Sequence, residues 1–188
     1  MRRYHPRHCS KRWKVKVLTP RLQALPPQEG GWLEVDITAQ RLVYRQGEES
    51  RREWPVSTAL AGTGQQEGSG CTPLGWHYIR AAIGEGLPPG TVFRGRRPTG
   101  ECYNAELAAA NPERDWILTR ILWLCGLERG FNRGGNVDTQ RRYIYFHGTP
   151  PDQPMGVPRS HGCIRMRDTD LLELFKLAPP GTPVWLHS

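Results

Sequence analysis

The chain has 188 residues, a formal net charge of +8 at pH 7 and a mean hydropathy of −0.61. No run approaches the roughly 18 to 20 apolar residues of a membrane-spanning helix, so we expect no transmembrane segment. The 21 glycines and 17 prolines favour a β fold with many turns over a helical bundle. The positive charge suits an anionic partner such as nucleic acid, a membrane surface or an acidic wall polymer. Because no nucleic-acid-binding motif or basic helix accompanies it, we expect no nucleic acid partner.

The cysteines and the basic start of the chain exclude two further classes. Five cysteines are scattered without a CxxC pair, which predicts neither a disulfide framework nor a zinc site, and we expect no metal and no cofactor. The first residues, MRRYHPRHCSKRWKVKV, lack the apolar core and small-residue cleavage site of a secretory signal. On the sequence alone the protein is therefore expected in the cytoplasm.

Alternating apolar and polar residues predict several strands. Residues 33–38 (LEVDIT) and 41–46 (RLVYRQ) alternate on either side of a short turn and are expected to form a hairpin. The stretch 14–18 reads as a short strand, and 72–80 as a turn leading into one. The segment 87–101 carries turn signals at both ends.

Two helices are expected among these strands. Residues 111–126 read as one long helix that begins at Asn111 and ends at Gly126, with an apolar middle that would be mostly buried. Residues 168–177 read as a shorter helix with Asp168 as its N-cap.

Two further strands complete the expected order. Residues 141–148 (RRYIYFHG) are rich in aromatic and β-branched side chains, and 182–188 form a closing strand. The predicted fold class is therefore mainly β (α+β), with one long and one short helix.

The heptapeptide SHGCIRM at 160–166 carries the strongest chemical signal. A free thiol with a pKa near 8.5 is mostly protonated at neutral pH, and a nearby imidazole that takes the proton activates it. His161 lies two residues before Cys163, and His147 ends the strand one loop upstream, where it could face the cysteine across adjacent strands. Which of the two histidines is the principal base stays open.

The glycine of this heptapeptide fits the same chemistry. Gly162 lets the backbone turn without a side chain, so that the amides of Gly162 and Cys163 could form an oxyanion hole. A single cysteine is more often a small buried hydrophobe, and we expect that structural role for Cys71, Cys102 and Cys125. The combination of HGT and SHGC favours a nucleophile at Cys163.

These motifs carry a family resemblance. The segments IYFHGTP and VPRSHGCIRMRDTDLLELF resemble the signature of the L,D-transpeptidases, the YkuD catalytic domain family: His-Gly-Thr, a short loop, then Ser/Thr-His-Gly-Cys, an apolar residue and Arg or Asn. The TPLG at 72–75 fits as well, and the resemblance covers roughly residues 32 to 186. It implies a β-sandwich-like catalytic domain over 31–188, preceded by a basic N-terminal segment, 1–30, that holds the short strand.

The resemblance also implies a reaction on peptidoglycan stem peptides. Cys163 would be the nucleophile, His147 the general base and His161 a second active-site histidine, with the Gly162 and Cys163 amides holding the oxyanion. The thiolate would attack the carbonyl of the third residue of a tetrapeptide, release D-Ala, and pass the acyl group to an amine acceptor. A 3–3 cross-link would result, a 1–3 linkage is possible, and carbapenem-type inhibitors would acylate the cysteine.

The substrate-binding residues are less sharply defined. Arg165 would anchor a stem carboxylate or, equally, form a salt bridge within the fold. Ser160 would position the loop by hydrogen bonding, and Thr149 and Tyr145 would line the cleft.

Two alternatives to transpeptidation stay open. An L,D-carboxypeptidase or wall amide hydrolase would use the same Cys/His site, whereas a non-catalytic basic wall-binding module would leave the cysteine inert. A wall substrate also implies the periplasm or the cell wall, against the cytoplasm that the missing signal suggests.

Overall fold

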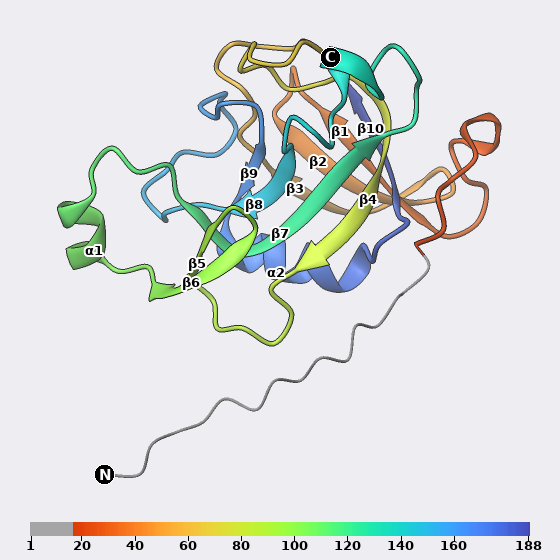
Figure 1. The fold of residues 1–188 in the computed structure, drawn as a ribbon. Helices are drawn as coiled ribbons and strands as arrows, with labels where there is room; N and C mark the ends of the chain where they lie inside the picture. Colours follow the sequence, from red (N-terminus) through yellow and green to blue (C-terminus); the bar gives the residue numbers. More distant parts are fainter. Residues whose placement is uncertain (1–16) are drawn as a thin grey trace, which may run out of the picture.

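The computed structural model describes residues 17–188 and places all of its strands in one hydrogen-bonded sheet (Figure 1). The strands are β1 (Gly31–Asp36), β2 (Arg41–Gln46), β3 (Glu49–Pro55), β4 (Gly75–Ile83), β5 (Thr91–Arg94), β6 (Arg97–Cys102), β7 (Ile117–Gly126), β8 (Tyr145–Gly148), β9 (Ile164–Met166) and β10 (Pro183–His187). The helices are α1 (Ala105–Ala110) and α2 (Asp168–Leu177), with 3-10 turns at Leu22–Ala24 and Gly135–Val137. The mainly β prediction is confirmed.

The sheet has a main path and a branch. Its main order is β3-β2-β1-β10-β4-β7-β5-β6, and β8 leaves this path by pairing with β7 and then with β9. The predicted β1–β2 hairpin is confirmed by an antiparallel register from Gly31↔Gln46 to Asp36↔Arg41. The carboxylate of Asp36 accepts a hydrogen bond from the Ala39 N–H at 2.8 Å, which closes the turn between the two strands.

One core joins the two parts of the sheet. Its buried side chains come from β1, β2, β3, β4, β7 and β10 on the main path, from β8 and β9 on the branch, and from α2; examples are Leu33, Leu42, Ile79, Leu122, Phe146, Ile164, Leu174 and Val184. Both parts of the sheet therefore face the same apolar interior, and α2 packs against β7 and β8 (Figure 1). Among residues 17–188 no helix is long and apolar enough to cross a membrane.

The long helix predicted over 111–126 is wrong. Residues Ile117–Gly126 form β7, which pairs with β4 and β5 and also with β8. A strand covered on both faces is apolar without alternation, so its run of buried residues cannot be told from a buried helix by periodicity. The expected N-cap, Asn111, is the C-cap of α1, a six-residue helix that the sequence analysis missed.

The two helix starts differ in how they are capped. At α1 the Asn104 side chain accepts a hydrogen bond from the Leu107 N–H at 2.8 Å, a side-chain cap of the usual kind. The helix α2 has the predicted bounds, but its N-cap is Arg167 and not Asp168. Asp168 begins the helix instead, where its negative charge suits the positive end of the helix dipole.

The remaining strand predictions differ in outcome. The strand expected at 72–80 is β4, and the closing strand is β10. The strand expected at 141–148 is confirmed only in its second half, because residues 141–143 form a turn before β8. Most of the strand expected at 14–18 lies outside the described residues, and residues 17 and 18 belong to no strand.

Candidate active site

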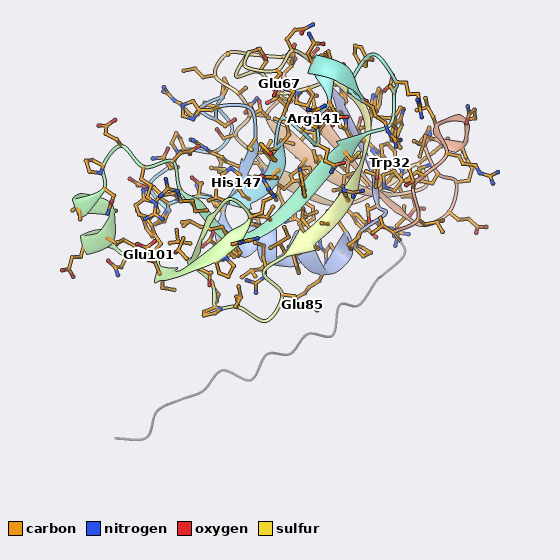
Figure 2. All side chains as sticks on the ribbon, in the orientation of Figure 1. Trp32, Glu67, Glu85, Glu101, Arg141 and His147 are labelled. Carbon is orange, nitrogen blue, oxygen red and sulfur yellow. The ribbon has the colours of Figure 1, made fainter. Side chains whose placement is uncertain are left out.

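The pairing of β8 with β9 brings the two sequence motifs together. The strands run parallel, with Phe146 opposite Ile164 and His147 opposite Arg165. Phe146 and Ile164 are fully buried in the main core. Because side chains alternate along a strand, His147, Arg165 and Cys163 belong to the opposite face of this strand pair. Figure 2 shows His147 at these strands, in the interior of the view.

The Cys163 thiol lies against the backbone at the start of β8. Its Sγ accepts a hydrogen bond from the Tyr145 N–H at 3.4 Å and donates one to the Tyr143 carbonyl at 3.4 Å. Burial around the sulfur raises the pKa of Cys163 to about 12, although the Tyr145 N–H opposes this shift. The resting group is therefore a thiol, and it needs a base at the moment of attack.

His147 has its tautomer fixed by one contact. It is 1% exposed, and its Nδ1 lies 2.8 Å from the carbonyl oxygen of Gly148. Because a carbonyl only accepts, Nδ1 carries the proton and Nε2 keeps its lone pair. Burial lowers the pKa of His147, so the imidazole is neutral at physiological pH. A neutral imidazole with a free Nε2 is the form that can accept a proton.

The loop before Cys163 is held by two hydroxyl groups. Ser160 Oγ donates to the Cys163 carbonyl at 2.5 Å and accepts from the Gly162 N–H at 3.2 Å. Thr72, from the TPLG segment, donates its hydroxyl proton to the Gly162 carbonyl at 3.0 Å. The Gly162 N–H can therefore reach an oxyanion only by leaving Ser160.

Glycine is required at both positions that follow a motif histidine. Gly162 has φ +127°, and a Cβ there would lie 3.2 Å from Ile144 Cδ1 and 3.3 Å from the Cys71 carbonyl oxygen. At Gly148 a Cβ would lie 2.8 Å from the Leu118 carbonyl oxygen and would overlap the Asp168 carboxylate. Both glycines allow the close packing that fixes the site.

Arg165 is paired inside the fold. Its Nη2 lies 2.8 Å from Asp115 Oδ1, its Nη1 donates to the Arg159 carbonyl at 3.2 Å, and the side chain is only 9% exposed. The same carboxylate lies 3.5 Å, through Oδ2, from Nδ1 of His161, whose side chain is 79% exposed. Of the two roles expected for Arg165, the internal salt bridge is the one present. Asp115 thus links two residues of the SHGCIRM motif.

A cleft of about 370 Å³ opens beside this salt bridge. Its lining includes Thr149, His161 and Arg165, together with the acidic side chains of Asp115 and Asp152. Neither Cys163 nor His147 is among its lining residues, so the cleft reaches the SHGCIRM motif at His161 and Arg165 and does not enclose the thiol. Within residues 17–188 no group of three or more histidine, cysteine or acidic side chains is placed to hold a metal ion.

The remaining predicted site residues are both buried. Thr149, 4% exposed, lines two neighbouring clefts. Tyr145, also 4% exposed, accepts a hydrogen bond on its hydroxyl from Arg96 Nη1 at 3.0 Å. Burial raises the pKa of the Tyr145 phenol, and the neighbouring Arg96 opposes that shift.

Four contributors to the site were not predicted as such from the sequence. Asp115 lies in the stretch expected to be a helix, and Arg96 and Tyr143 belong to no site motif. Thr72 lay in the TPLG segment, so its position, though not its role, was visible. The other three act through contacts between segments far apart in the chain.

Comparison with known proteins gives one family match and several similar folds. The sequence model of the L,D-transpeptidase catalytic domain, YkuD, matches residues 30–186. An L,D-transpeptidase from Mycobacterium smegmatis has a similar structure, with TM-score 0.50 and 18% identity over 85% of this chain and 59% of that one. L,D-transpeptidase 3 from Mycobacterium tuberculosis, in complex with a faropenem-derived adduct, gives TM-score 0.53 and 13% identity over 85% and 60%.

A third structure, the L,D-transpeptidase LdtMt1 in complex with imipenem, gives TM-score 0.51 and 16% identity over 85% of this chain and 59% of that one. At these identities the likeness concerns the fold, and the chain spans about three-fifths of each of these proteins. No curated protein sequence matches the chain significantly. The family match covers most of the chain, and the chain belongs to the L,D-transpeptidase catalytic domain (YkuD) family.

Proposed function

We propose that the chain is a peptidoglycan L,D-transpeptidase that uses Cys163 as nucleophile and His147 as general base. The main support is the Nδ1–H bond of His147 to the Gly148 carbonyl, on the same face of β8 and β9 as the thiol. That bond directs the proton-accepting Nε2 away from the backbone. His161 is largely exposed beside Asp115. It is the second active-site histidine, and it orients or polarises the Cys163 thiol.

In the acylation step the thiol and the base act together. Because burial keeps the pKa of Cys163 near 12, the thiol proton passes to His147 Nε2 as Sγ bonds to the carbonyl carbon of the third stem residue. The Cys163 N–H, joined by the Gly162 N–H once it leaves Ser160, stabilises the oxyanion. Collapse breaks the C–N bond, and the departing D-Ala amine takes the proton from His147.

The second half of the reaction, deacylation, returns the enzyme to its starting state. The amine of an acceptor stem attacks the thioester, His147 takes its proton, and the C–S bond breaks as the thiol is restored. A 3–3 cross-link forms when the acceptor is the diamino acid side chain, and another amine position would give a 1–3 linkage. Such a substrate implies that the reaction takes place in the periplasm or the cell wall.

Mass spectrometry with a disaccharide-tetrapeptide tests the proposal. The purified chain is expected to form a dimer lacking one D-Ala, and Cys163→Ala is expected to abolish it. The matched control is Cys102→Ala, which removes an exposed free thiol of β6 and leaves activity unchanged. Tripeptide without dimer would assign the same site to an L,D-carboxypeptidase. Full turnover by Cys163→Ala would exclude Cys163 as the nucleophile.

Inhibitor acylation gives an independent test of the same thiol. The structural neighbours include an L,D-transpeptidase in complex with imipenem and another with a faropenem-derived adduct. Imipenem is accordingly expected to add to the peptide that contains Cys163, and His147→Gln is expected to slow the addition. Addition at the same rate in that variant would assign the base to another group.

A further inference from the structure

The salt bridge of Arg165 leaves one requirement of the proposed function unmet. A tetrapeptide stem is anionic, so a binding site for it needs a cation near the nucleophile. Arg165 is unsuited to this, because it is 9% exposed and two of its guanidinium nitrogens are bonded to Asp115 and to the Arg159 carbonyl. Arg142, the other cation whose charge acts on Cys163, is also occupied, because it donates to the carbonyls of Gly64, Gln65 and Cys71. The role therefore falls to a cation other than these two.

Arg96 lies in the turn between β5 and β6 and reaches over an aromatic group. Its guanidinium carbon is 4.4 Å from the ring centre of Tyr143 and 4.7 Å from that of Trp123. Its Nη1 donates to the Tyr145 hydroxyl at 3.0 Å. Two aromatic rings and one hydroxyl therefore fix the position of the charge.

The same tyrosines contact the nucleophile. The carbonyl of Tyr143 accepts from the Cys163 thiol, and the N–H of Tyr145 donates to its sulfur, both at 3.4 Å. The side chains of these two residues thus hold Arg96, while their backbone holds Cys163. The guanidinium and the thiol are thus linked through two shared residues.

Arg96 also has no acidic partner among residues 17–188, in contrast to nearby arginines. Arg114 pairs with Glu101 at 2.8 Å, and Arg165 pairs with Asp115. The hydrogen bond to Tyr145 raises the pKa of Arg96, which keeps the group charged. Its remaining N–H donors form a planar fork that matches a carboxylate.

We propose that Arg96 is a carboxylate-binding residue that holds the donor stem peptide next to Cys163. This inference rests on the proposed function. On either side of the bond that is cleaved, the tetrapeptide offers two such groups: the C-terminal carboxylate of D-Ala, and the second carboxylate of a diamino acid of the diaminopimelate type. Both present the same chemistry to a guanidinium, and amidation of one at a time distinguishes them.

Steady-state kinetics with three substrates tests the assignment. The substrates are a tetrapeptide with both carboxylates free, one amidated at the C-terminus, and one amidated at the diamino acid. Loss of a charge-assisted pair is expected to raise the KM of Arg96→Gln for the free acid by about 10- to 100-fold, with a smaller change in kcat. The matched control, Arg97→Gln, removes an exposed charge from the same hairpin and should leave KM unchanged.

The amidated substrates identify the carboxylate. For the wild-type enzyme, only one of the two amidations should raise KM. For Arg96→Gln, the KM for that amidated substrate should be no higher than the KM for the free acid. Equal KM values for the wild type and Arg96→Gln would overturn the assignment. An equal rise in the KM of Arg96→Gln for all three substrates would overturn it as well. Wild-type KM values that neither amidation changes would overturn the assignment without any variant. If Arg96→Gln folds poorly, Arg96→Lys, which keeps the charge but loses the planar fork, is the second variant and should also raise the KM for the free acid. Failure of the proposed function has a different result, namely no acyl-enzyme on Cys163 from any substrate.

Discussion

Replacing Asp115 by asparagine tests the salt bridge that joins the SHGCIRM motif to the rest of the site. The substitution keeps the side-chain shape and removes the charge, so Arg165 stays buried without its acid. Removing one partner of a fully buried pair costs about 3–5 kcal/mol. Since Asp115 is 47% exposed, water screens part of the interaction, and we expect a loss of about 1–3 kcal/mol in unfolding free energy.

The reverse substitution should cost less. Arg165→Met keeps most of the aliphatic packing and leaves a half-exposed carboxylate that water can solvate, so the expected loss is below about 1 kcal/mol. Urea unfolding of the two single variants and of the double variant measures both losses and their coupling. The reasoning is refuted if Arg165→Met destabilises the protein more than Asp115→Asn does.

The same pair of variants should move the reactivity of the thiol in opposite directions. Burial is the main reason for the high pKa of Cys163; the Asp115 charge raises it further, and the Arg165 charge lowers it. Asp115→Asn should therefore speed iodoacetamide alkylation of Cys163 at fixed pH, and Arg165→Met should slow it. Peptide mass spectrometry follows the Cys163 peptide, with the exposed Cys102 as internal reference. A shift of both variants in the same direction would contradict the electrostatic account.

Three further variants probe the loop and the interior. Ser160→Ala should lose about 1–2 kcal/mol in urea unfolding and slow acylation by imipenem, because both hydrogen bonds of the Ser160 hydroxyl disappear. Gly162→Ala should abolish acylation and lower the melting temperature more than Gly156→Ala, which has φ +79° and open space at its Cβ. Burial lowers the pKa of His77 from 6.5 to about 4, so between these pH values the unfolded chain binds a proton that the folded chain does not. The unfolding free energy should thus fall by about 3 kcal/mol on acidification from pH 6.5 to 4. In His77→Gln, urea unfolding at the same pH values should show an unfolding free energy that depends less on pH.

Local patterns were sufficient where the structure is local. The hairpin of β1 and β2 and the bounds of α2 follow from alternation, from helical periodicity and from turn residues near in sequence. The site motifs were equally visible, because β8 and β9 each carry their own motif within a few residues. One loop connects them, so their pairing could be expected from the spacing.

Contacts between distant segments were not accessible in the same way. Asp115 and Arg165 are 50 positions apart, and Arg96 and Tyr145 are 49 apart. Nothing in the spacing of these residues predicts that they meet, because their positions depend on how β7 enters the sheet. The sequence therefore indicated the candidate nucleophile and the two histidines, but not the charges that surround them.

The wrong helix prediction and the missed charges have the same cause, namely the extended form of β7. Asp115 lies just before this strand and holds Arg165, Ile121 within it pairs with His147, and Trp123 further along supports Arg96. In an extended strand Asp115, Ile121 and Trp123 are spread along the length of the site, at about 3.3 Å per residue. A helix over the same residues would compress that span to about 1.5 Å per residue and leave β8 with β9 as its one remaining strand neighbour. The extended form of Ile117–Gly126 is thus what sets the salt bridge, His147 and the aromatic group that holds Arg96 side by side along one strand.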